Sequence, residues 1–136
     1  PLEVYGLNLT HKHVPEFQKY TGLTRRPIFV PTVANFHTGM IDHIAVHFDL
    51  LKGVTNAKQL EDVLKARYAG CEWVRVVDAD EKGRIEPTSL NNTNRIDLSV
   101  YGNDTLGQAV LTAKYDNLGK GASGAAVQNL KLMLGI

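Results

Sequence analysis

The closing stretch of the chain, Tyr115 to Leu130, constrains the fold most, because an apolar strand there runs through a glycine-rich turn into a helix. Glycine has no Cβ, so this turn can approach another surface closely. Apolar residues at helical spacing then define one face: Ala122, Ala126, Val127, Leu130, Met133 and Leu134. Free N–H groups at the start of such a helix can bind an anion or a polar cofactor group. The alternative is a tight turn whose small residues serve helix packing.

The spacing Gly119-x-Gly121-x-x-Gly124 matches the dinucleotide fingerprint, but the context of the motif does not fit. A Rossmann unit continues into a second parallel strand and carries an acidic residue about 20 positions further on. The sequence ends at Ile136, which leaves no room for either feature. We therefore expect the turn to touch a nucleotide held by another domain rather than to form the nucleotide's own domain.

Length and charge are those of an ordinary globular domain. The 136 residues suffice for one domain with a core. The net charge of +1 and the lack of a basic run predict neither a nucleic-acid nor a membrane partner. No apolar segment approaches the roughly 20 residues that span a bilayer, and the single cysteine excludes an internal disulfide. We therefore expect a reducing, cytoplasmic location. The sequence begins at Pro1, which indicates processing or a piece of a longer protein.

Hydrophobic periodicity predicts more strands than helices. Strands are expected over residues 2–7, 26–33, 39–50, 73–77, 95–101 and 106–115, and helices over 15–20, 56–68 and the closing segment. Within 39–50, apolar and polar residues alternate, so one face should be covered and the other polar. Gly102-Asn103-Asp104 is a hairpin signal between two strands. The fold class is α+β, with helices on one face of a mixed, mainly antiparallel sheet.

His11, His13 and Glu16 form the densest polar constellation. In extended backbone both imidazoles point to the same side, and Glu16 follows His13 by one helical turn. A carboxylate that holds one ring nitrogen raises the basicity of the other, which is how a general acid/base is built. The alternative is a polar loop before a helix, with Glu16 a favourable first-turn charge.

Other potentially reactive side chains carry weaker signals. His43 and His47 are spaced for zinc on a helix, but a strand puts them on the solvent face, and we expect no metal site. Cys71 follows a predicted helix end and precedes Glu72. Both features disfavour a thiolate, so we expect Cys71 to be structural or incidental.

Two motifs far apart in the chain match one enzyme family. His11, His13, Pro15 and Glu16 match His-x-His-x-Pro-Glu, and residues 116–128 match Asp-Asn-Leu-x-Lys-Gly-Ala-x-x-x-Ala-Val-Gln. Residues 29–32 and 35–39 are similar to the family's middle segment. On these matches the chain resembles the N-acetyl-gamma-glutamyl-phosphate reductases of arginine biosynthesis over essentially all of its length. One departure is Thr38, where the family often has an arginine.

The resemblance implies that residues 1–136 are a single α+β catalytic and dimerisation domain, similar to that of glyceraldehyde-3-phosphate dehydrogenase. An N-terminal NADP-binding Rossmann domain and a nucleophilic cysteine would lie in a part absent from this chain, which would be inactive alone. In such enzymes the cysteine attacks the acyl phosphate and expels phosphate. NADPH then reduces the thioester, and the hemithioacetal collapses to N-acetylglutamate 5-semialdehyde.

The resemblance also implies roles for individual residues. His13 would be the acid/base at the hemithioacetal oxygen, oriented by Glu16, and His11 would contact the substrate. Asn117, Gly119 and Gly121 would lie at the nicotinamide edge of the cofactor. Lys120 would meet an anionic group of the substrate or cofactor, the alternative being a cation without a specific partner. The exposed sheet face would form the subunit interface of a homo-oligomer.

Two other functional hypotheses remain. The chain could be a stand-alone, non-catalytic binding or oligomerisation module of the same fold, because a fold can outlast its chemistry. A weaker reading is metal-assisted hydrolysis by the histidines.

Overall fold

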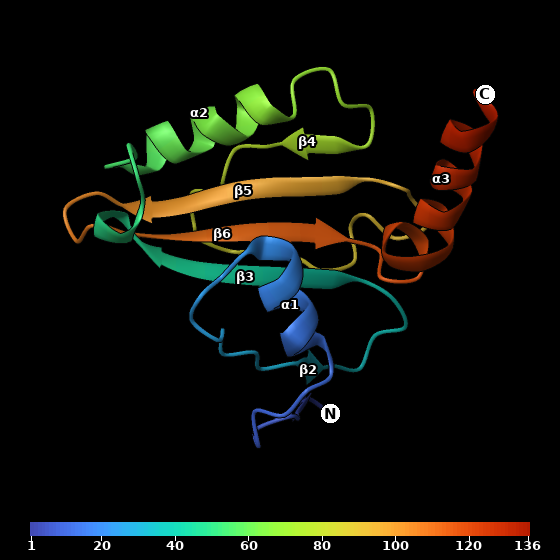
Figure 1. Cartoon of the computed structure of the whole chain (residues 1–136), viewed down its shortest axis with the longest axis horizontal. Coiled ribbons are helices and arrows are strands. Elements are labelled where there is room, and N and C mark those ends of the chain that lie inside the picture. Colours follow the sequence, from blue (N-terminus) through green and yellow to red (C-terminus); the bar gives the residue numbers. More distant parts are fainter. The chain divides into compact units, whose positions relative to one another are not determined.

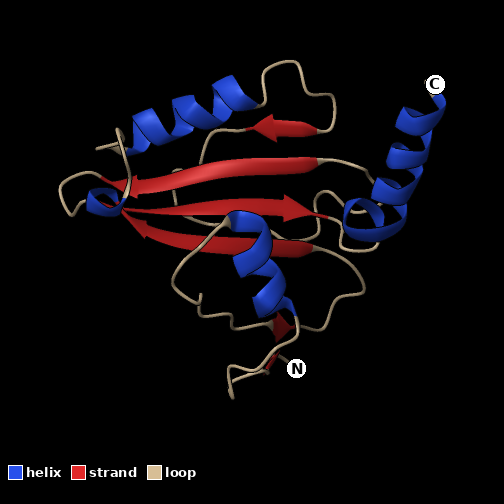
Figure 2. Ribbon diagram, in the orientation of Figure 1, coloured by secondary structure: helices blue, strands red, loops and turns tan.

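The computed structural model describes residues 1–136, which form two compact units, Pro1–His37 and Thr38–Ile136 (Figures 1 and 2). In the first unit, β1 (Glu3–Val4) pairs antiparallel with β2 (Thr32–Val33). The helix α1 (His13–Thr21) ends at Gly22, whose φ of 71° is left-handed and whose N–H donates to the Gln18 carbonyl. This unit therefore has only a two-stranded ribbon and one short helix.

Both strands expected in the first unit are shorter than the sequence predicted. The strand expected over 26–33 is reduced to Thr32–Val33. Pro27 and Pro31 lack the N–H group that a strand ladder needs, so most of this segment stays irregular. The strand expected over 2–7 is likewise confined to Glu3–Val4. Beyond it, the Tyr5 N–H donates one further hydrogen bond to the Pro31 carbonyl.

The second unit is built on a four-stranded sheet in the order β3-β6-β5-β4 (Figure 1). Its strands are β3 (Met40–His47), β4 (Val74–Val76), β5 (Ile96–Asn103) and β6 (Gln108–Tyr115). The β3–β6 and β5–β6 pairs are antiparallel, and β4 runs parallel to β5. The predicted α+β class with a mixed, mainly antiparallel sheet is confirmed.

One face of this sheet holds the core. The helix α2 (Ala57–Arg67) begins at Asn56, whose side-chain oxygen accepts a hydrogen bond from the Gln59 N–H. It packs against β5 and β4, and its Leu60 joins Phe48 and Ala109 in the buried cluster. A Cβ at Gly102 would overlap the Cβ of Ala57. Glycine at this strand position therefore lets the helix approach the sheet closely.

The long strand predicted over 39–50 ends early. It stops at His47, and Phe48–Leu50 form the 3-10 helix η1, which turns Phe48 into the core. The predicted alternation gives β3 an apolar and a polar side, but the apolar side is only partly covered. Val46 packs against the core cluster, whereas Ile44 is 59% exposed.

The predicted position of the hairpin turn between β5 and β6 is wrong. Gly102 and Asn103 remain in β5, and the chain turns over residues 104–107. The turn closes through a hydrogen bond from the Gly107 N–H to the Asp104 carbonyl, and Gly107 has a left-handed φ of 66°. Packing of Gly102 against α2 explains why this glycine stays in the strand.

The chain closes with the π-helical turn η2 (Gly119–Ser123) and the helix α3 (Gly124–Leu134) (Figure 2). The predicted helix is confirmed, but its apolar face is not buried: Val127 and Leu130 are more than half exposed. No helix of the protein combines the length and the apolar character that crossing a membrane requires.

Candidate functional site

The histidine constellation lies at the start of α1. His13 is the first residue of the helix, and its backbone N–H donates to His11 Nδ1 at 3.3 Å. The next N–H, that of Val14, donates to the His11 carbonyl at 3.1 Å. Lys12, which lies between the two histidines, makes no side-chain capping hydrogen bond. His11 therefore supplies acceptors to two of the helix's first N–H groups.

An aromatic cluster surrounds the two imidazoles. The His11 ring centroid is 4.8 Å from that of His13 and 5.0 Å from that of Phe29, both in edge-on geometry. Phe17, one turn after His13, meets Phe29 at 5.1 Å, and Tyr5 lies 6.0 Å from His11. The two histidines lie side by side and are both half-buried. The extended backbone from which the sequence predicted this arrangement is wrong, because Lys12 and His13 are already helical.

Glu16 does not make the contact that the sequence suggested. Its side chain is exposed in the first turn of α1, and no hydrogen bond or ion pair joins it to His13. The His13 ring instead turns toward His11 and Phe17. In this arrangement Glu16 is a favourable charge at the positive end of the helix dipole.

In the second unit, Asp116 organises the glycine-rich turn that follows β6. This carboxylate is 3% exposed and accepts the N–H groups of Leu118 at 2.8 Å, Gly119 at 2.9 Å and Asn92 at 2.7 Å. The Asp116 carbonyl accepts the Gly121 N–H at 2.9 Å. The prediction that this turn presents free N–H groups to an anion is therefore wrong for Leu118, Gly119 and Gly121.

Sequence reasoning missed Asp116 as an organising residue. The signal was present, since an aspartate directly before a turn often accepts the N–H groups two and three residues on. Its bond to Asn92 could not be anticipated, because 24 positions separate the two residues.

All three glycines of the turn have packing reasons within the unit. A Cβ at Gly119 would lie 2.8 Å from the Thr93 carbonyl oxygen, and one at Gly121 would lie 3.2 Å from the Tyr115 ring. A Cβ at Gly124 would overlap the side-chain oxygen of Asn94. These contacts agree with the packing alternative stated for the turn.

Asn117 joins this turn to the start of β3. Its Oδ1 accepts the Gly39 N–H at 2.9 Å, while its amide nitrogen makes no hydrogen bond. Gly39 has a φ of 122°, and a Cβ there would lie 2.6 Å from the Pro87 carbonyl oxygen, so only glycine fits. The neighbouring Thr38 carbonyl accepts the Asn91 amide at 2.9 Å. Asn117 is thus fixed by its oxygen and keeps a free donor.

Lys120 has a partner within the turn and the following helix. Its Nζ donates to the Gln128 side-chain oxygen at 2.6 Å, and the same oxygen accepts the Asn94 amide at 3.1 Å. Lys120 therefore has a specific partner within the protein, and its contact with a substrate or cofactor stays a prediction. The ammonium group still has two further hydrogens to donate.

Tyr115, the last residue of β6, pairs with β3. Its hydroxyl donates to Asp42 Oδ2 at 2.8 Å. Burial, followed by the negative charge of Asp42 and this hydrogen bond, raises the pKa of the Tyr115 phenol well above its usual range. Because Gly121 lies against the same ring, Tyr115 also supports the turn.

The remaining candidates lie outside these two groups. His43 and His47 are exposed on β3, opposite Thr112 and Gln108. No group of three or more His, Cys, Asp or Glu side chains could hold a metal ion. Cys71 is a free, exposed thiol in the loop after α2.

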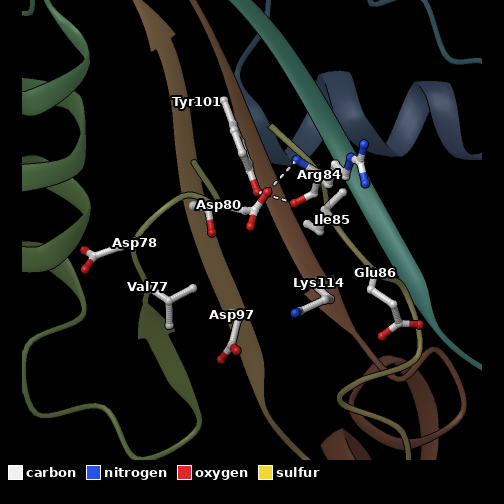
Figure 3. Close-up of a pocket in the computed structure, with 10 residues that line it drawn as sticks. Val77, Asp78, Asp80, Arg84, Ile85, Glu86, Asp97, Tyr101 and Lys114 are labelled. Atoms are coloured by element: carbon white, nitrogen blue, oxygen red, sulfur yellow. Dashed lines mark hydrogen bonds between the residues drawn. The ribbon is translucent and has the colours of Figure 1, made fainter. Parts of the chain in front are cut away.

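A cavity of about 310 Å³ lies on the polar face of the sheet (Figure 3), and no sequence motif predicts it. Asp97, Tyr101 and Lys114 line it from the strands, and the loop after β4 covers it. This loop is held by hydrogen bonds from the Tyr101 hydroxyl to the Arg84 carbonyl and from the Arg84 N–H to Asp80. No predicted site residue lines this cavity.

Two carboxylates that line this cavity, Asp97 and Glu86, have partners within the protein. Arg75 donates to both carboxylate oxygens of Asp97, at 2.8 and 2.9 Å. The Thr88 hydroxyl and N–H lower the pKa of the Glu86 carboxyl. The Arg75–Asp97 pair joins β4 to β5, and the Glu86–Thr88 contacts lie within the loop itself.

Comparison with known proteins identifies similar chains. The sequence model of one family, described as "Semialdehyde dehydrogenase, dimerisation domain", matches residues 1–117. N-acetyl-gamma-glutamyl-phosphate reductase 2 of Pseudomonas putida is 45% identical over 137 residues, which cover 98% of this chain and 44% of that protein.

Two further relatives give the same picture. The N-acetyl-gamma-glutamyl-phosphate reductase of Burkholderia cenocepacia is 46% identical over 138 residues, covering 99% of this chain. That of a Chelativorans species is 46% identical over 135 residues, covering 96% of it. The chain spans 44% of the length of each of these relatives. The resemblance inferred from the sequence motifs is confirmed.

Proposed function

Because the chain belongs to the semialdehyde dehydrogenase dimerisation-domain family, we propose that it is the catalytic and dimerisation domain of an NADP-dependent reductase. This enzyme converts N-acetyl-gamma-glutamyl phosphate to N-acetylglutamate 5-semialdehyde and phosphate in arginine biosynthesis. The observation that supports this proposal most is the 45–46% identity, over nearly the whole chain, to proteins that carry the name of this reductase.

The proposal divides the enzyme between this chain and a further part. The relatives are more than twice as long as the chain. We assign an N-terminal Rossmann domain, which binds NADP, and the nucleophilic cysteine to that further part. Residues 1–136 supply the acid/base, substrate contacts and the subunit interface, and they have no activity alone. The enzyme works in the cytoplasm as a homo-oligomer, whose subunits meet through the exposed sheet of this domain.

His13 moves the proton at the reacting carbonyl oxygen. This oxygen gains negative charge when the acyl carbon is attacked, and an imidazole can give and take a proton there near neutral pH. The backbone N–H of His13 is bonded to His11, whereas its ring nitrogens make no hydrogen bond and stay available. Glu16 lies on the same helix, three residues later, and orients His13 when the substrate is bound. His11 contacts the substrate.

The residues of the closing turn differ in the hydrogen-bond donors that they can offer to a cofactor. NADPH, when bound, supplies the hydride. The free amide nitrogen of Asn117, held in place through its oxygen, fits a carbonyl oxygen such as that of a carboxamide. Gly119 and Gly121 have no free N–H to offer, because Asp116 accepts both, so they contribute a surface without side chains at the cofactor edge. Lys120 donates its remaining hydrogens to an anionic group of the substrate.

Substitution of His13 tests the proposal. In the full-length enzyme, His13→Ala should lower kcat by roughly 10²–10⁴-fold, which is the usual effect of losing a positioned acid/base. His37→Ala is the matched control, since His37 is an exposed histidine of the same unit outside the aromatic cluster. An unchanged kcat in His13→Ala would remove this residue from the mechanism.

A further inference from the structure

We propose that His11 is a positioning residue, which caps α1 through Nδ1, fixes His13 by this bond, and leaves its Nε2–H as the only ring group that meets the substrate. The catalytic part of this inference rests on the proposed function, whereas the capping contact itself lies within residues 1–37 and can be tested alone.

The helix start shows that His11, rather than Lys12, is the capping residue. Lys12 already has helical dihedral angles, φ −58° and ψ −26°, and its side chain makes no capping bond. A capping side chain accepts the N–H two or three residues further on. His11 Nδ1 accepts the His13 N–H, two residues on, and the His11 carbonyl accepts the Val14 N–H. The imidazole thus replaces the aspartate, asparagine or serine that is common at this position.

The cap determines which ring nitrogen carries the proton. A nitrogen that accepts a hydrogen bond needs its lone pair, and a neutral imidazole has one acceptor and one donor nitrogen. While His11 Nδ1 accepts this hydrogen bond, the ring carries its proton on Nε2. Toward the substrate it can only donate, which suits an anionic oxygen such as a carboxylate or phosphoryl oxygen.

Packing holds the ring in this orientation. Phe29 and Tyr5 contact the His11 ring at centroid distances of 5.0 and 6.0 Å. Gly6 has a φ of 67°, and a Cβ there would come within 3.9 Å of the His11 ring and 3.3 Å of Pro31. The ring that caps the helix is therefore held in place from outside the helix as well.

The same cap places His13. Its backbone N–H is the donor of the capping bond, and its ring lies 4.8 Å from the His11 ring. Loss of the cap would release the first turn of α1 and, with it, the His13 imidazole. We expect this loss to lower kcat without removing any group that touches the substrate.

Two substitutions distinguish the role of His11 Nδ1 from that of His11 Nε2. His11→Asn keeps an acceptor near the position of Nδ1 and removes Nε2–H. His11→Gln reaches the position of Nε2 with an amide donor and removes the acceptor at Nδ1. Amide hydrogen exchange of His13 in the 136-residue protein measures the cap without substrate. Exchange should stay slow in His11→Asn and accelerate by about 2- to 30-fold in His11→Gln, the range expected for loss of a helix cap.

Steady-state kinetics of the full-length enzyme test positioning. His11→Asn should raise KM and keep kcat, whereas His11→Gln should lower kcat and keep KM within a few fold. If the His13 amide exchanged at the same rate in both variants, the proposal that His11 Nδ1 caps α1 would be wrong. Accelerated exchange with an unchanged kcat in His11→Gln would overturn positioning. Absence of turnover in the unsubstituted enzyme would instead refute the proposed function. The exchange rates would still show whether His11 caps α1.

Discussion

The side-chain oxygen of Asn117 accepts a hydrogen bond from the backbone N–H of Gly39 at 2.9 Å, although 78 positions separate the two residues. The bond joins the start of β3 to the turn that follows β6. It occupies the oxygen of the Asn117 amide and leaves the nitrogen free. One side chain therefore combines a structural contact with a free donor, which we propose contacts the cofactor.

Two substitutions of Asn117 should separate these roles. Asn117→Ala leaves the Gly39 N–H without its partner and should lower the free energy of unfolding by about 1–3 kcal/mol. Asn117→Asp keeps the acceptor and removes the donor, so it should cost less stability but weaken NADPH binding by about tenfold in the full-length enzyme. Urea unfolding and NADPH titration measure the two effects. Equal stability of the two variants would contradict the structural role.

Asp116→Asn should destabilise the second unit. The carboxylate accepts three N–H groups in a buried site, and an amide has only one oxygen to accept them. We expect a loss of about 2–3 kcal/mol in the free energy of unfolding, measured by urea unfolding. Asp49→Asn, at an exposed aspartate of η1, is the control and should have almost no effect. Equal effects of the two substitutions would show that the Asp116 carboxylate does not organise the turn.

Gly102→Ala should push α2 away from the sheet, because the added Cβ overlaps that of Ala57. We expect a loss of about 1–3 kcal/mol of stability, as for other overpacked cores. Ala57→Gly in the same chain should recover part of this loss, since it removes the overlapping atom. A double-mutant cycle measured by thermal unfolding gives the coupling energy. Purely additive effects would place the two residues out of contact.

Tyr115 should make stability fall at alkaline pH. Its pKa is raised above 10.0 in the folded protein, so the folded state holds this proton more tightly than the unfolded chain. The resulting stabilisation is complete below about pH 10 and is lost as the pH rises from there toward the folded pKa.

Tyr115→Phe should remove this part of the pH dependence, as measured by urea unfolding across the alkaline range. The raised pKa of Lys65 acts in the same direction but is common to both proteins and cancels in the comparison. Tyr20→Phe, at a tyrosine that is 79% exposed, is the control. The same alkaline decline in both variants would disprove the role of Tyr115.

Elements specified by local signals were predicted well. The helix over 56–68 was recognised because its apolar pattern is local, and Asn56 is a good cap. Strands β5 and β6 follow from alternation in adjacent segments. The errors occur where contacts between residues far apart in the sequence determine the local structure. Gly102 looks like a turn residue until α2 is packed against it, and Phe48 leaves the strand to reach the core.

For the candidate site too, local features were easier to predict than contacts between residues far apart in the sequence. The rings of His11 and His13 do lie together, but the extended backbone that the spacing argument assumed is replaced by the start of a helix. The capping bond to His11 Nδ1 depends on this turn geometry, which the sequence does not reveal. The Asp116–Asn92 and Asn117–Gly39 bonds join residues far apart in the chain. The catalytic and cofactor roles of these residues stay predictions.

The proposed reductase activity is tested most directly by an assay of the native protein, isolated from its own cells. We would measure phosphate-dependent reduction of NADP with N-acetylglutamate 5-semialdehyde, which is the reverse of the proposed reaction. We expect steady NADPH formation that requires both phosphate and the semialdehyde. A folded native protein that forms no NADPH under these conditions would contradict it and would favour a non-catalytic module of the same fold.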